Sequence, residues 1–384
     1  MMDLESFLAS KPLFYNVIDY ERFPKAYLSV APLLRIPKII HIVGTNGKGS
    51  TGRFLATALH RLGKKTGHYT SPHIMQFNER IWIDGKDIAN ADLAAAHEKL
   101  MGFLDIQTAD ALSYFEYTTL LAMVAFEQCE YVVLEAGLGG EFDATNVFDK
   151  VLSIFTPIDF DHSAFLGSTI ELIASTKLRS MQKSALLGIQ KHSEVERIAC
   201  EIALSKHCSL YKVQDLQDTR IHTMGWHLAT KNGLSEYLRD NCELAMVAFE
   251  LLGYKAEELL FDQSALFGRL SRIAKNVTLD VGHNALAARA IVEAFQGKKI
   301  TLVYNTYADK DYREILTILT PIIESVEIIW VEEGRIVPRT LLEEVLGDLG
   351  LTYGSFEFIN SEKEYLIFGS FSVAEAFLKR KNNP

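Results

Sequence analysis

The chain lacks the features that mark a secreted, membrane-spanning or cysteine-rich protein. It has only four cysteines, with no CxxC pair and no His/Cys cluster at metal-ligand spacing: Cys129, Cys200, Cys208 and Cys242. No uncharged run reaches the ~18 residues that a membrane helix needs. The start MMDLESFLAS has neither the basic region nor the long apolar region of a signal peptide. We therefore expect a cytoplasmic protein with reduced, mostly buried thiols and no membrane partner.

An excess of positive charge is also absent. The net charge is −10, so the chain has no dense basic footprint with which to neutralise the phosphates of a nucleic acid. Hydrophobic residues make up 48% of the sequence and charged residues 23%, which is ordinary for a folded globular enzyme. At 384 residues the chain is long enough for two domains. A small anionic ligand would need a local site.

Short apolar runs alternate with helical patterns in the first half of the chain. The β-branched run Ile36–Val43 stops at a glycine, and Ser50–Leu62 then has the pattern of a helix. Similar strand-like runs recur at Tyr131–Glu135 and Val151–Phe155. Buried strands that alternate with helices indicate an α/β layer with a mainly parallel sheet.

The alternation restarts near residues 266–271, where we place the linker. The predicted strands beyond it are Val277–Val281, Ile300–Asn305, Val326–Val331 and Tyr365–Phe368, and the predicted helices are Ala285–Phe295, Tyr312–Leu319, Arg339–Leu349 and Ser372–Leu378. The predicted fold is therefore α/β in two domains. A P-loop-type ATPase domain with a mainly parallel sheet covers residues 1–266, and a smaller doubly wound, Rossmann-like domain covers residues 271–384.

A glycine-rich segment lies where an anion site belongs, after a buried strand and before a helix. It reads Gly44-Thr45-Asn46-Gly47-Lys48-Gly49-Ser50. Backbone N–H groups in such a turn can point at phosphate oxygens, the helix N-terminus adds partial positive charge, and Lys48 brings a full charge to the β- and γ-phosphates. The segment departs from the GxxxxGK[ST] pattern, because Ile42 holds the first glycine position and Gly49 separates Lys48 from Ser50. The segment predicts nucleotide binding by Thr45, Asn46, Gly47, Lys48, Gly49 and Ser50.

This heptapeptide resembles the phosphate loop of the Mur ligase superfamily, and its GKGS ending is similar to the folylpolyglutamate synthase and dihydrofolate synthase branch. Further motifs of that family follow in the family's order: Tyr69-Thr70-Ser71-Pro72-His73, Phe77-Asn78-Glu79-Arg80-Ile81, Phe115-Glu116, Leu134-Glu135-Ala136-Gly137-Leu138-Gly139-Gly140, Asp143-Ala144-Thr145-Asn146-Val147, Asp161-His162, Gly268-Arg269, Asp280-Val281-Gly282-His283-Asn284, Asp309-Lys310-Asp311 and Gly369-Ser370-Phe371. The resemblance implies a monomeric, ATP- and magnesium-dependent amide ligase. Such an enzyme joins L-glutamate to dihydropteroate, to tetrahydrofolate or to both through an acyl phosphate.

The resemblance also implies a set of metal ligands. Ser71 and Glu135 match the family's ligands to a first magnesium ion, and His162 matches a ligand to a second. Lys177 lies where the family carries a carbamylated lysine, which would supply oxygen ligands. The usual KAGI sequence reads Lys177-Leu178-Arg179-Ser180 here. A surface lysine on a helix is therefore the alternative for Lys177, and a cap or turn hydroxyl is the alternative for Ser71.

On the pterin side, the resemblance implies substrate contacts from three segments. The matching residues are Asp19, Tyr20, Ser113, Tyr114, Phe115, Glu116, Phe142, Asp143 and Ala144. A planar pterin would gain from aromatic walls and from a carboxylate that accepts its N–H groups. Relatives usually carry Arg-Leu where this chain has Glu141-Phe142, which puts any contact of that arginine with an anionic substrate in doubt. Ordinary core packing is the alternative for Phe115 and Tyr20.

Four later residues resemble those that complete the nucleotide site from the far side of the linker: Asn241, Arg269, Asp280 and His283. An arginine is always charged and suits phosphate oxygens, and Asp280 ends a predicted strand. The residues to which we assign the chemistry are Lys48, His162, Lys177, Asp280 and His283. For Asn241 taken alone, surface polarity is the simpler explanation.

Two other functions are compatible with a loop of this kind. A cell-wall Mur-type amino-acid ligase shares the loop and the mechanism but generally carries an extra N-terminal domain, for which the ~35 residues before the first strand are too few. A non-ligase P-loop protein would bind or hydrolyse nucleotide without regard to glutamate or pterin. The loop's departure from GxxxxGK[ST] and the presence of Asp280 and His283 disfavour it.

Overall fold

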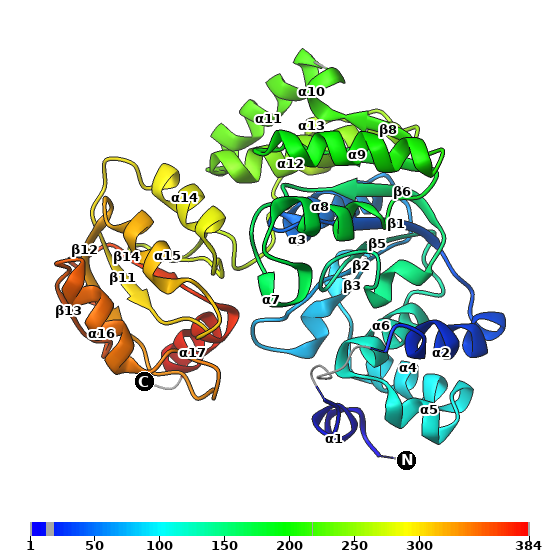
Figure 1. The fold of residues 1–384 in the computed structure, drawn as a ribbon, viewed down its shortest axis with the longest axis horizontal. Coiled ribbons are helices and arrows are strands. Elements are labelled where there is room, and N and C mark those ends of the chain that lie inside the picture. Colours follow the sequence, from blue (N-terminus) through cyan, green and yellow to red (C-terminus); the bar gives the residue numbers. More distant parts are fainter. Residues whose placement is uncertain (1, 13–18, 217, 383–384) are drawn as a thin grey trace. The chain divides into compact units, whose positions relative to one another are not determined.

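The computed structural model describes residues 2–12, 19–216 and 218–382 (Figure 1). The chain divides into two compact units. Unit 1 comprises Met1–Asn232 and Asp240–Ser264, and unit 2 comprises Gly233–Arg239 and Ala265–Pro384. The short segment Gly233–Arg239 of unit 2, which interrupts unit 1 along the chain, includes the start of the helix α12 (Glu236–Leu251).

Unit 1 is built on an eight-stranded sheet with the strand order β4-β3-β2-β5-β1-β6-β7-β8. Its strands are β1 (Lys38–Val43), β2 (Thr66–Tyr69), β3 (Ile81–Ile83), β4 (Lys86–Asp87), β5 (Tyr131–Glu135), β6 (Lys150–Phe155), β7 (Ser184–Leu187) and β8 (Ser209–Lys212). All neighbours pair in parallel except β2 with β3 and β3 with β4. The central strand β1 is buried from its second residue onward, and its register sets Ile42 opposite Glu135 of β5. The ends of β1 and β5 therefore meet at one edge of the sheet.

Helices and short 3₁₀ turns cover this sheet. They are α1 (Leu4–Ala9), α2 (Arg22–Val30), η1 (Ala31–Leu33), α3 (Lys48–Arg61), η2 (Phe77–Arg80), α4 (Asn90–Phe103), α5 (Ile106–Ala111), α6 (Tyr114–Ala125), η3 (Ala144–Val147), α7 (Ser163–Leu166), α8 (Ile170–Leu178), α9 (Ser193–Ser205), α10 (Val213–Leu216), α11 (Thr219–Asn232) and α13 (Glu258–Phe261). One core joins α1, α2, α4, α5 and α6 to β1, β2 and β5. A second core joins α8 and α9 to β1, β6 and β7. Burial of both cores fixes the loops at the strand ends.

Unit 2 contains a six-stranded sheet with the strand order β13-β12-β11-β14-β10-β9. Its elements are β9 (Ser271–Ala274), β10 (Val277–Leu279), α14 (Ala285–Ala294), β11 (Ile300–Tyr304), α15 (Tyr312–Leu319), β12 (Ile323–Ile328), α16 (Arg339–Asp348), β13 (Tyr353–Ser355), β14 (Tyr365–Phe368) and α17 (Phe371–Asn382). Only β9 runs antiparallel to its neighbour. In the part of the chain that the structure describes, no helix is long and apolar enough to cross a membrane.

The predicted fold class is confirmed, and several boundaries differ from the prediction. The strand Tyr131–Glu135 and the helix Tyr312–Leu319 have the predicted bounds, whereas α3 begins at Lys48 and not at Ser50. The strand predicted at Val326–Val331 is β12, which runs from Ile323 to Ile328. Its start was missed because polar residues follow Ile323, although the backbone there already pairs with β11. The antiparallel strands β3, β4 and β9 were not predicted.

Candidate active site

The glycine-rich loop of unit 1 connects β1 to α3 and is tied to the turn after β6. Thr45 donates its backbone N–H to the Pro157 carbonyl oxygen at 2.9 Å. The Thr45 hydroxyl donates to the carbonyl oxygen of Asp159 at 2.9 Å and accepts from the Asp159 N–H at 3.1 Å. Gly47 then precedes α3 with a left-handed φ of 87°. The loop is therefore anchored, just before α3, to the residues that follow the neighbouring strand β6.

The first turn of α3 offers groups that suit an anion. Ser50 is buried, and its Oγ atom has no hydrogen-bond partner among the described residues. A buried hydroxyl without a partner is costly, so a ligand oxygen or water that bonded to it would be stabilised there. Lys48 Nζ donates to the carbonyl oxygens of Gly44 and Thr45, both at 3.2 Å. The lysine thus lies over the loop, where a phosphate group would lie next to it.

Asn241 lies beside this loop, within unit 1. The Thr51 hydroxyl donates to Asn241 Oδ1 at 3.4 Å. A Cβ atom on Gly47 would collide with the same side-chain amide. The prediction that Asn241 acts from the far side of the linker is wrong, because α12 returns the chain to unit 1 at Asp240. Asn241 lies close to the loop because this part of α12 belongs to unit 1, which the sequence alone did not show.

Lys177 on α8 is deeply buried next to the loop. Its Nζ atom donates to the Gly44 carbonyl oxygen at 2.9 Å, and only 4% of the residue is exposed. Burial, reinforced by the nearby charge of Lys48, lowers the pKa of Lys177 to about 7. This burial excludes the alternative of a surface lysine. A large fraction of the amine is neutral at neutral pH and is able to act as a nucleophile.

The predicted metal ligands come from neighbouring strand ends. Glu135 is buried at the end of β5, and its Oε2 atom accepts the Ser71 N–H at 3.2 Å. His162 is the N-cap residue of α7, and its Nε2 atom lies 3.9 Å from Oδ1 of Asp161. Among the described residues, no group of three or more His, Cys, Asp or Glu side chains is arranged to hold a metal ion. The hydroxyl and carboxylate oxygens of Ser71 and Glu135 are hard donors that fit magnesium.

Two of the predicted pterin-side carboxylates are engaged by the protein itself. Glu116 caps α6, where it accepts the Ser113 N–H at 2.7 Å and pairs with Ser113 in a capping box. It also accepts two hydrogen bonds from the Arg22 guanidinium, at 3.0 and 3.1 Å. Asp19 accepts the N–H groups of Glu21 and Arg22 at the start of α2. The Arg22–Glu116 pair thus joins two helices and was not predicted, since its members lie 94 residues apart and no local pattern links them.

Asp143 is buried as well, and its carboxylate is hydrogen-bonded to its own loop. It accepts hydrogen bonds from the Leu138 N–H at 2.7 Å and from the Thr145 N–H at 2.9 Å, and another from the Thr145 hydroxyl. Burial raises the pKa of Asp143, and these hydrogen bonds oppose the rise. Ala144 follows as the first residue of η3 and is also buried. The geometry assigns Asp143 to holding the loop that follows β5.

Exposed aromatic rings lie close to these anchored segments. The rings of Tyr20 and Phe142 have centroids 4.4 Å apart, and more than half of each residue is exposed. Tyr20 therefore does not pack in the core. The Phe115 ring lies against Gly137, where a Cβ atom would clash with it, and the Arg80 guanidinium lies 5.2 Å from the Tyr114 ring centroid. Tyr20 and Phe142 form an aromatic surface that a planar ligand could contact.

The two segments that depart from the family pattern contact each other through Glu141 and Arg179. Arg179 Nη1 lies 3.2 Å from Glu141 Oε2. The Glu141 N–H donates to the Thr176 carbonyl oxygen at 2.9 Å, so the loop after β5 is fastened to α8 close to Lys177. A guanidinium therefore lies beside position 141, and it comes from the C-cap residue of α8. Both departures were visible in the sequence, but their pairing was not.

In unit 2, the predicted residues gather at the carboxyl end of β10. Asp280 accepts hydrogen bonds from the Tyr237 hydroxyl at 2.9 Å, the Leu270 N–H at 2.9 Å and the Gly282 N–H at 2.7 Å. The Arg269 guanidinium lies 5.4 Å from the Phe371 ring centroid, and the His283 ring lies 6.4 Å from the same ring. Ligands of open α/β sheets bind at this edge.

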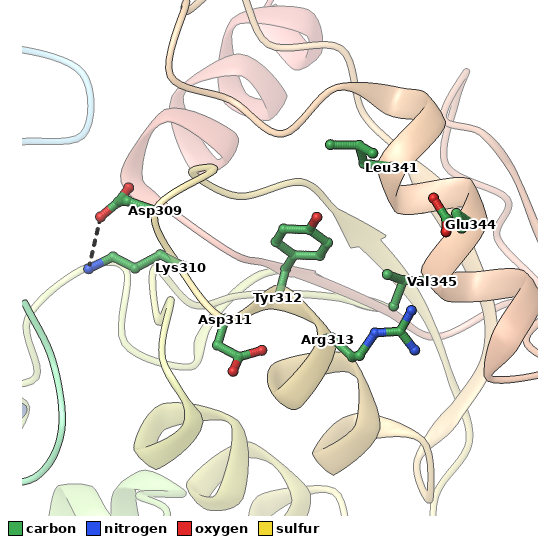
Figure 2. Close-up of a pocket in the computed structure, with 8 residues that line it drawn as sticks. All are labelled: Asp309, Lys310, Asp311, Tyr312, Arg313, Leu341, Glu344 and Val345. Atoms are coloured by element: carbon green, nitrogen blue, oxygen red, sulfur yellow. Dashed lines mark ion pairs between the residues drawn. The ribbon is translucent and has the colours of Figure 1, made fainter. Parts of the chain in front are cut away.

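Unit 2 also has a polar cavity of about 500 Å³ between α15 and α16 (Figure 2). Its lining comprises Asp309, Lys310, Asp311, Tyr312, Arg313, Leu341, Glu344 and Val345. Figure 2 shows the Lys310 side chain extending toward Asp309 and away from Leu341 and Val345. Its Nζ atom lies 3.7 Å from Asp309 Oδ2.

A two-unit α/β fold with a phosphate-type loop at the end of a central parallel strand defines the Mur-ligase-like class. No protein-family model matches the chain. The dihydrofolate synthase/folylpolyglutamate synthase of Haemophilus influenzae is 31% identical to it over 75% of this chain and 73% of that protein. The chain belongs to the dihydrofolate synthase/folylpolyglutamate synthase family, and it is accordingly a ligase that forms carbon–nitrogen bonds.

Solved structures agree with this assignment. The crystal structure of Helicobacter pylori folylpolyglutamate synthetase is similar to this chain with a TM-score of 0.80 and 39% identity, covering 99% of this chain and 98% of that one. The structure of Escherichia coli FolC in complex with DHPP and ADP has a TM-score of 0.82 and 25% identity, with coverage of 99% and 98%.

Proposed function

We propose that the protein uses ATP to join L-glutamate to the carboxylate of dihydropteroate, of tetrahydrofolate or of both. The observation that carries this proposal is the loop at the end of β1. Lys48 lies over it, the Ser50 hydroxyl is buried without a partner among the described residues, and Lys177 is buried against Gly44. Membership of the family supports the choice of glutamate and a pterin substrate. Both substrate activities appear in the names of its relatives.

The mechanism begins with charge neutralisation by the loop. Lys48 and the N–H groups of the first turn of α3 bind the β- and γ-phosphates and stabilise the charge that develops as the γ-phosphoryl group moves to the substrate carboxylate. Magnesium, held by Ser71, Glu135 and His162, would supply further positive charge to the phosphate oxygens. The amine of glutamate then attacks the acyl phosphate, so that an amide forms and phosphate leaves. We assign Arg269, Asp280 and His283 of unit 2 to the binding of the nucleotide.

Transfer of oxygen from the substrate carboxylate to the released phosphate tests the acyl-phosphate step. With an ¹⁸O-labelled substrate carboxylate, the released phosphate should carry one labelled oxygen per turnover. Unlabelled phosphate would rule this step out. ADP release with dihydropteroate and tetrahydrofolate offered separately, each with and without glutamate, then assigns the substrate. A non-ligase P-loop protein would release ADP at a rate that is independent of glutamate.

We further propose that Lys177 reacts with carbon dioxide. The neutral amine attacks CO₂, the N–C bond forms, and one proton is released as the carbamate appears. The product carries a carboxylate-type group in place of an ammonium, and its oxygen atoms would join the metal ligands. The low pKa of Lys177, about 7, supports the proposal, because an ordinary lysine amine is almost entirely protonated at neutral pH.

We expect Phe142→Ala to weaken the binding of the pterin substrate. The exposed rings of Tyr20 and Phe142 are tilted by 47° to each other and offer aromatic contacts to a ligand, so loss of one ring should raise the KM for the pterin substrate about tenfold with little change in the KM for ATP. Trp226→Ala is a matched control, because Trp226 is an exposed aromatic residue of α11. Equal kinetics of the Phe142→Ala variant and the wild type would remove this pair from the substrate site.

A further inference from the structure

Four side chains of unit 2 form a closed ring of contacts. The Tyr307 hydroxyl and Ser372 Oγ lie 2.7 Å apart, and Ser372 Oγ donates in turn to Glu333 Oε2. Arg335 Nε donates to Glu333 Oε1 at 2.8 Å, and Nη2 donates to the same oxygen. The Arg335 guanidinium also lies 4.6 Å from the centroid of the Tyr307 ring, which closes the ring of contacts. None of these residues was singled out in the sequence.

These residues follow the carboxyl ends of three parallel strands: Tyr307, Glu333 and Arg335 lie in loops, and Ser372 is the second residue of the helix α17. Tyr307 follows β11, Glu333 and Arg335 follow β12, and Ser372 follows β14. Backbone hydrogen bonds from Ala308 to Arg335 at 2.8 Å and from Val337 to Thr306 at 2.9 Å join the first two loops. The ring is therefore fixed by backbone as well as by side chains, at the sheet edge where α/β proteins bind ligands.

The first two residues of α17, just after β14, contact two different groups of side chains at this edge. Phe371 faces the nucleotide-side residues Arg269 and His283, whereas the next residue, Ser372, bonds to Tyr307 and Glu333. Because β14 lies between β10 and β11, the two groups of residues are separated by one strand. An enzyme that brings together a nucleotide-activated acyl group and a second substrate needs two such sites.

Arg335 is held in place before any ligand arrives. An exposed arginine ordinarily samples many rotamers and loses that freedom when it binds. Here Nε and Nη2 are fixed by Glu333 and the planar group is fixed by Tyr307, although 53% of the side chain is exposed. Arg335 Nη1 has no hydrogen-bond partner within residues 2–12, 19–216 and 218–382. A guanidinium with one free edge is suited to a carboxylate.

We propose that Arg335, positioned by Tyr307, Glu333 and Ser372, binds a carboxylate of the incoming L-glutamate. This inference rests on the proposed function and names the residue that recognises the amino-acid substrate. The adjacent Glu333 cancels the net charge of Arg335, so the ring attracts a polyanion such as a triphosphate weakly. A zwitterionic amino acid fits better, because its carboxylate can meet Arg335 while its ammonium group is favoured near Glu333.

The test is steady-state kinetics of Arg335→Met and Tyr307→Phe, with L-glutamate, ATP and the pterin substrate varied in turn. We expect Arg335→Met to raise the KM for glutamate about 30-fold, because a charge-assisted hydrogen bond is lost, and to change the other two KM values less than about twofold. Tyr307→Phe keeps the ring and loses only the hydroxyl, so we expect a rise of about threefold. Arg313→Met is the matched control, because Arg313 is an exposed arginine paired with Asp348 that lines the cavity in Figure 2.

Three outcomes would overturn the inference. The first is an unchanged KM for glutamate in Arg335→Met. The second is a rise in the KM for tetrahydrofolate alone in Arg335→Met, which would assign Arg335 to the substrate's own glutamyl carboxylates. The third is a rise in the KM for glutamate that occurs only in Arg313→Met. A titration of L-glutamate followed by ligand-observed NMR separates this inference from the proposed function. Arg335-dependent binding without turnover would support the inference and contradict the function. Turnover with glutamate binding that does not depend on Arg335 would contradict the inference and leave the proposed function in place.

Discussion

Replacing Lys48 with alanine is expected to lower kcat/KM for ATP by a factor on the order of 10³. The Lys48 ammonium lies over the carbonyl oxygens of Gly44 and Thr45, at the start of α3, where it would meet the β- and γ-phosphates. Charge on these oxygens grows as the γ-phosphoryl group leaves, so the lysine stabilises the transition state more than the bound substrate. The loss should therefore appear in kcat as well as in KM.

Lys64→Ala is the matched control for Lys48→Ala. Lys64 precedes β2, pairs with Glu130 at 3.4 Å and lies at the opposite end of the sheet strands. Its removal should leave turnover unchanged, and thermal unfolding of both variants should match the wild type within a few degrees. A Lys48→Ala enzyme that turns over normally would contradict the assignment of the loop to the triphosphate.

The features that could be predicted from the sequence are those set by local chemistry. The β-branched run before Gly44 and the helical pattern after it predict a strand, a tight turn and a helix, and the structure has all three. Glu135 was predicted at a strand end because an apolar run stops there, and β5 ends at that residue. In each case the physical cause lies within a few residues of the feature.

Contacts between distant segments could not be predicted in this way. The Arg22–Glu116 pair, the Glu141–Arg179 pair and the ring around Arg335 each join residues that only the tertiary fold brings together. Asp143 illustrates the same limit in reverse. Its motif predicts a ligand contact, which stays a prediction, and the fold adds a second role by burying its carboxylate under hydrogen bonds from Leu138 and Thr145. Sequence motifs identify residues that matter, and the fold decides which groups remain free to bind.

Lys177→Ala is expected to lower turnover by a factor on the order of 10², because the variant loses both the amine and the carbamate that we propose forms on it. In the wild type, the pKa of about 7 sets the pH dependence. Above pH 7 the amine is mostly neutral and reacts with CO₂. Below about pH 6 more than nine-tenths of it is protonated and cannot react. Added bicarbonate should therefore raise activity near pH 6.5 and have little effect at pH 8.

Chemical trapping of the carbamate followed by mass spectrometry locates the modification. Lys150 is the internal control, because burial also lowers its pKa to about 7. However, Lys150 Nζ donates both to the Ser180 carbonyl oxygen at 3.0 Å and to the Asn146 carbonyl oxygen at 3.3 Å, whereas Lys177 Nζ has the Gly44 carbonyl as its one acceptor among the described residues and lies beside the phosphate loop. The label should therefore appear on Lys177 and not on Lys150. Label on both lysines would mean that a low pKa alone directs the reaction, and label on neither, with activity indifferent to bicarbonate, would mean that Lys177 acts as a free amine beside the phosphate loop.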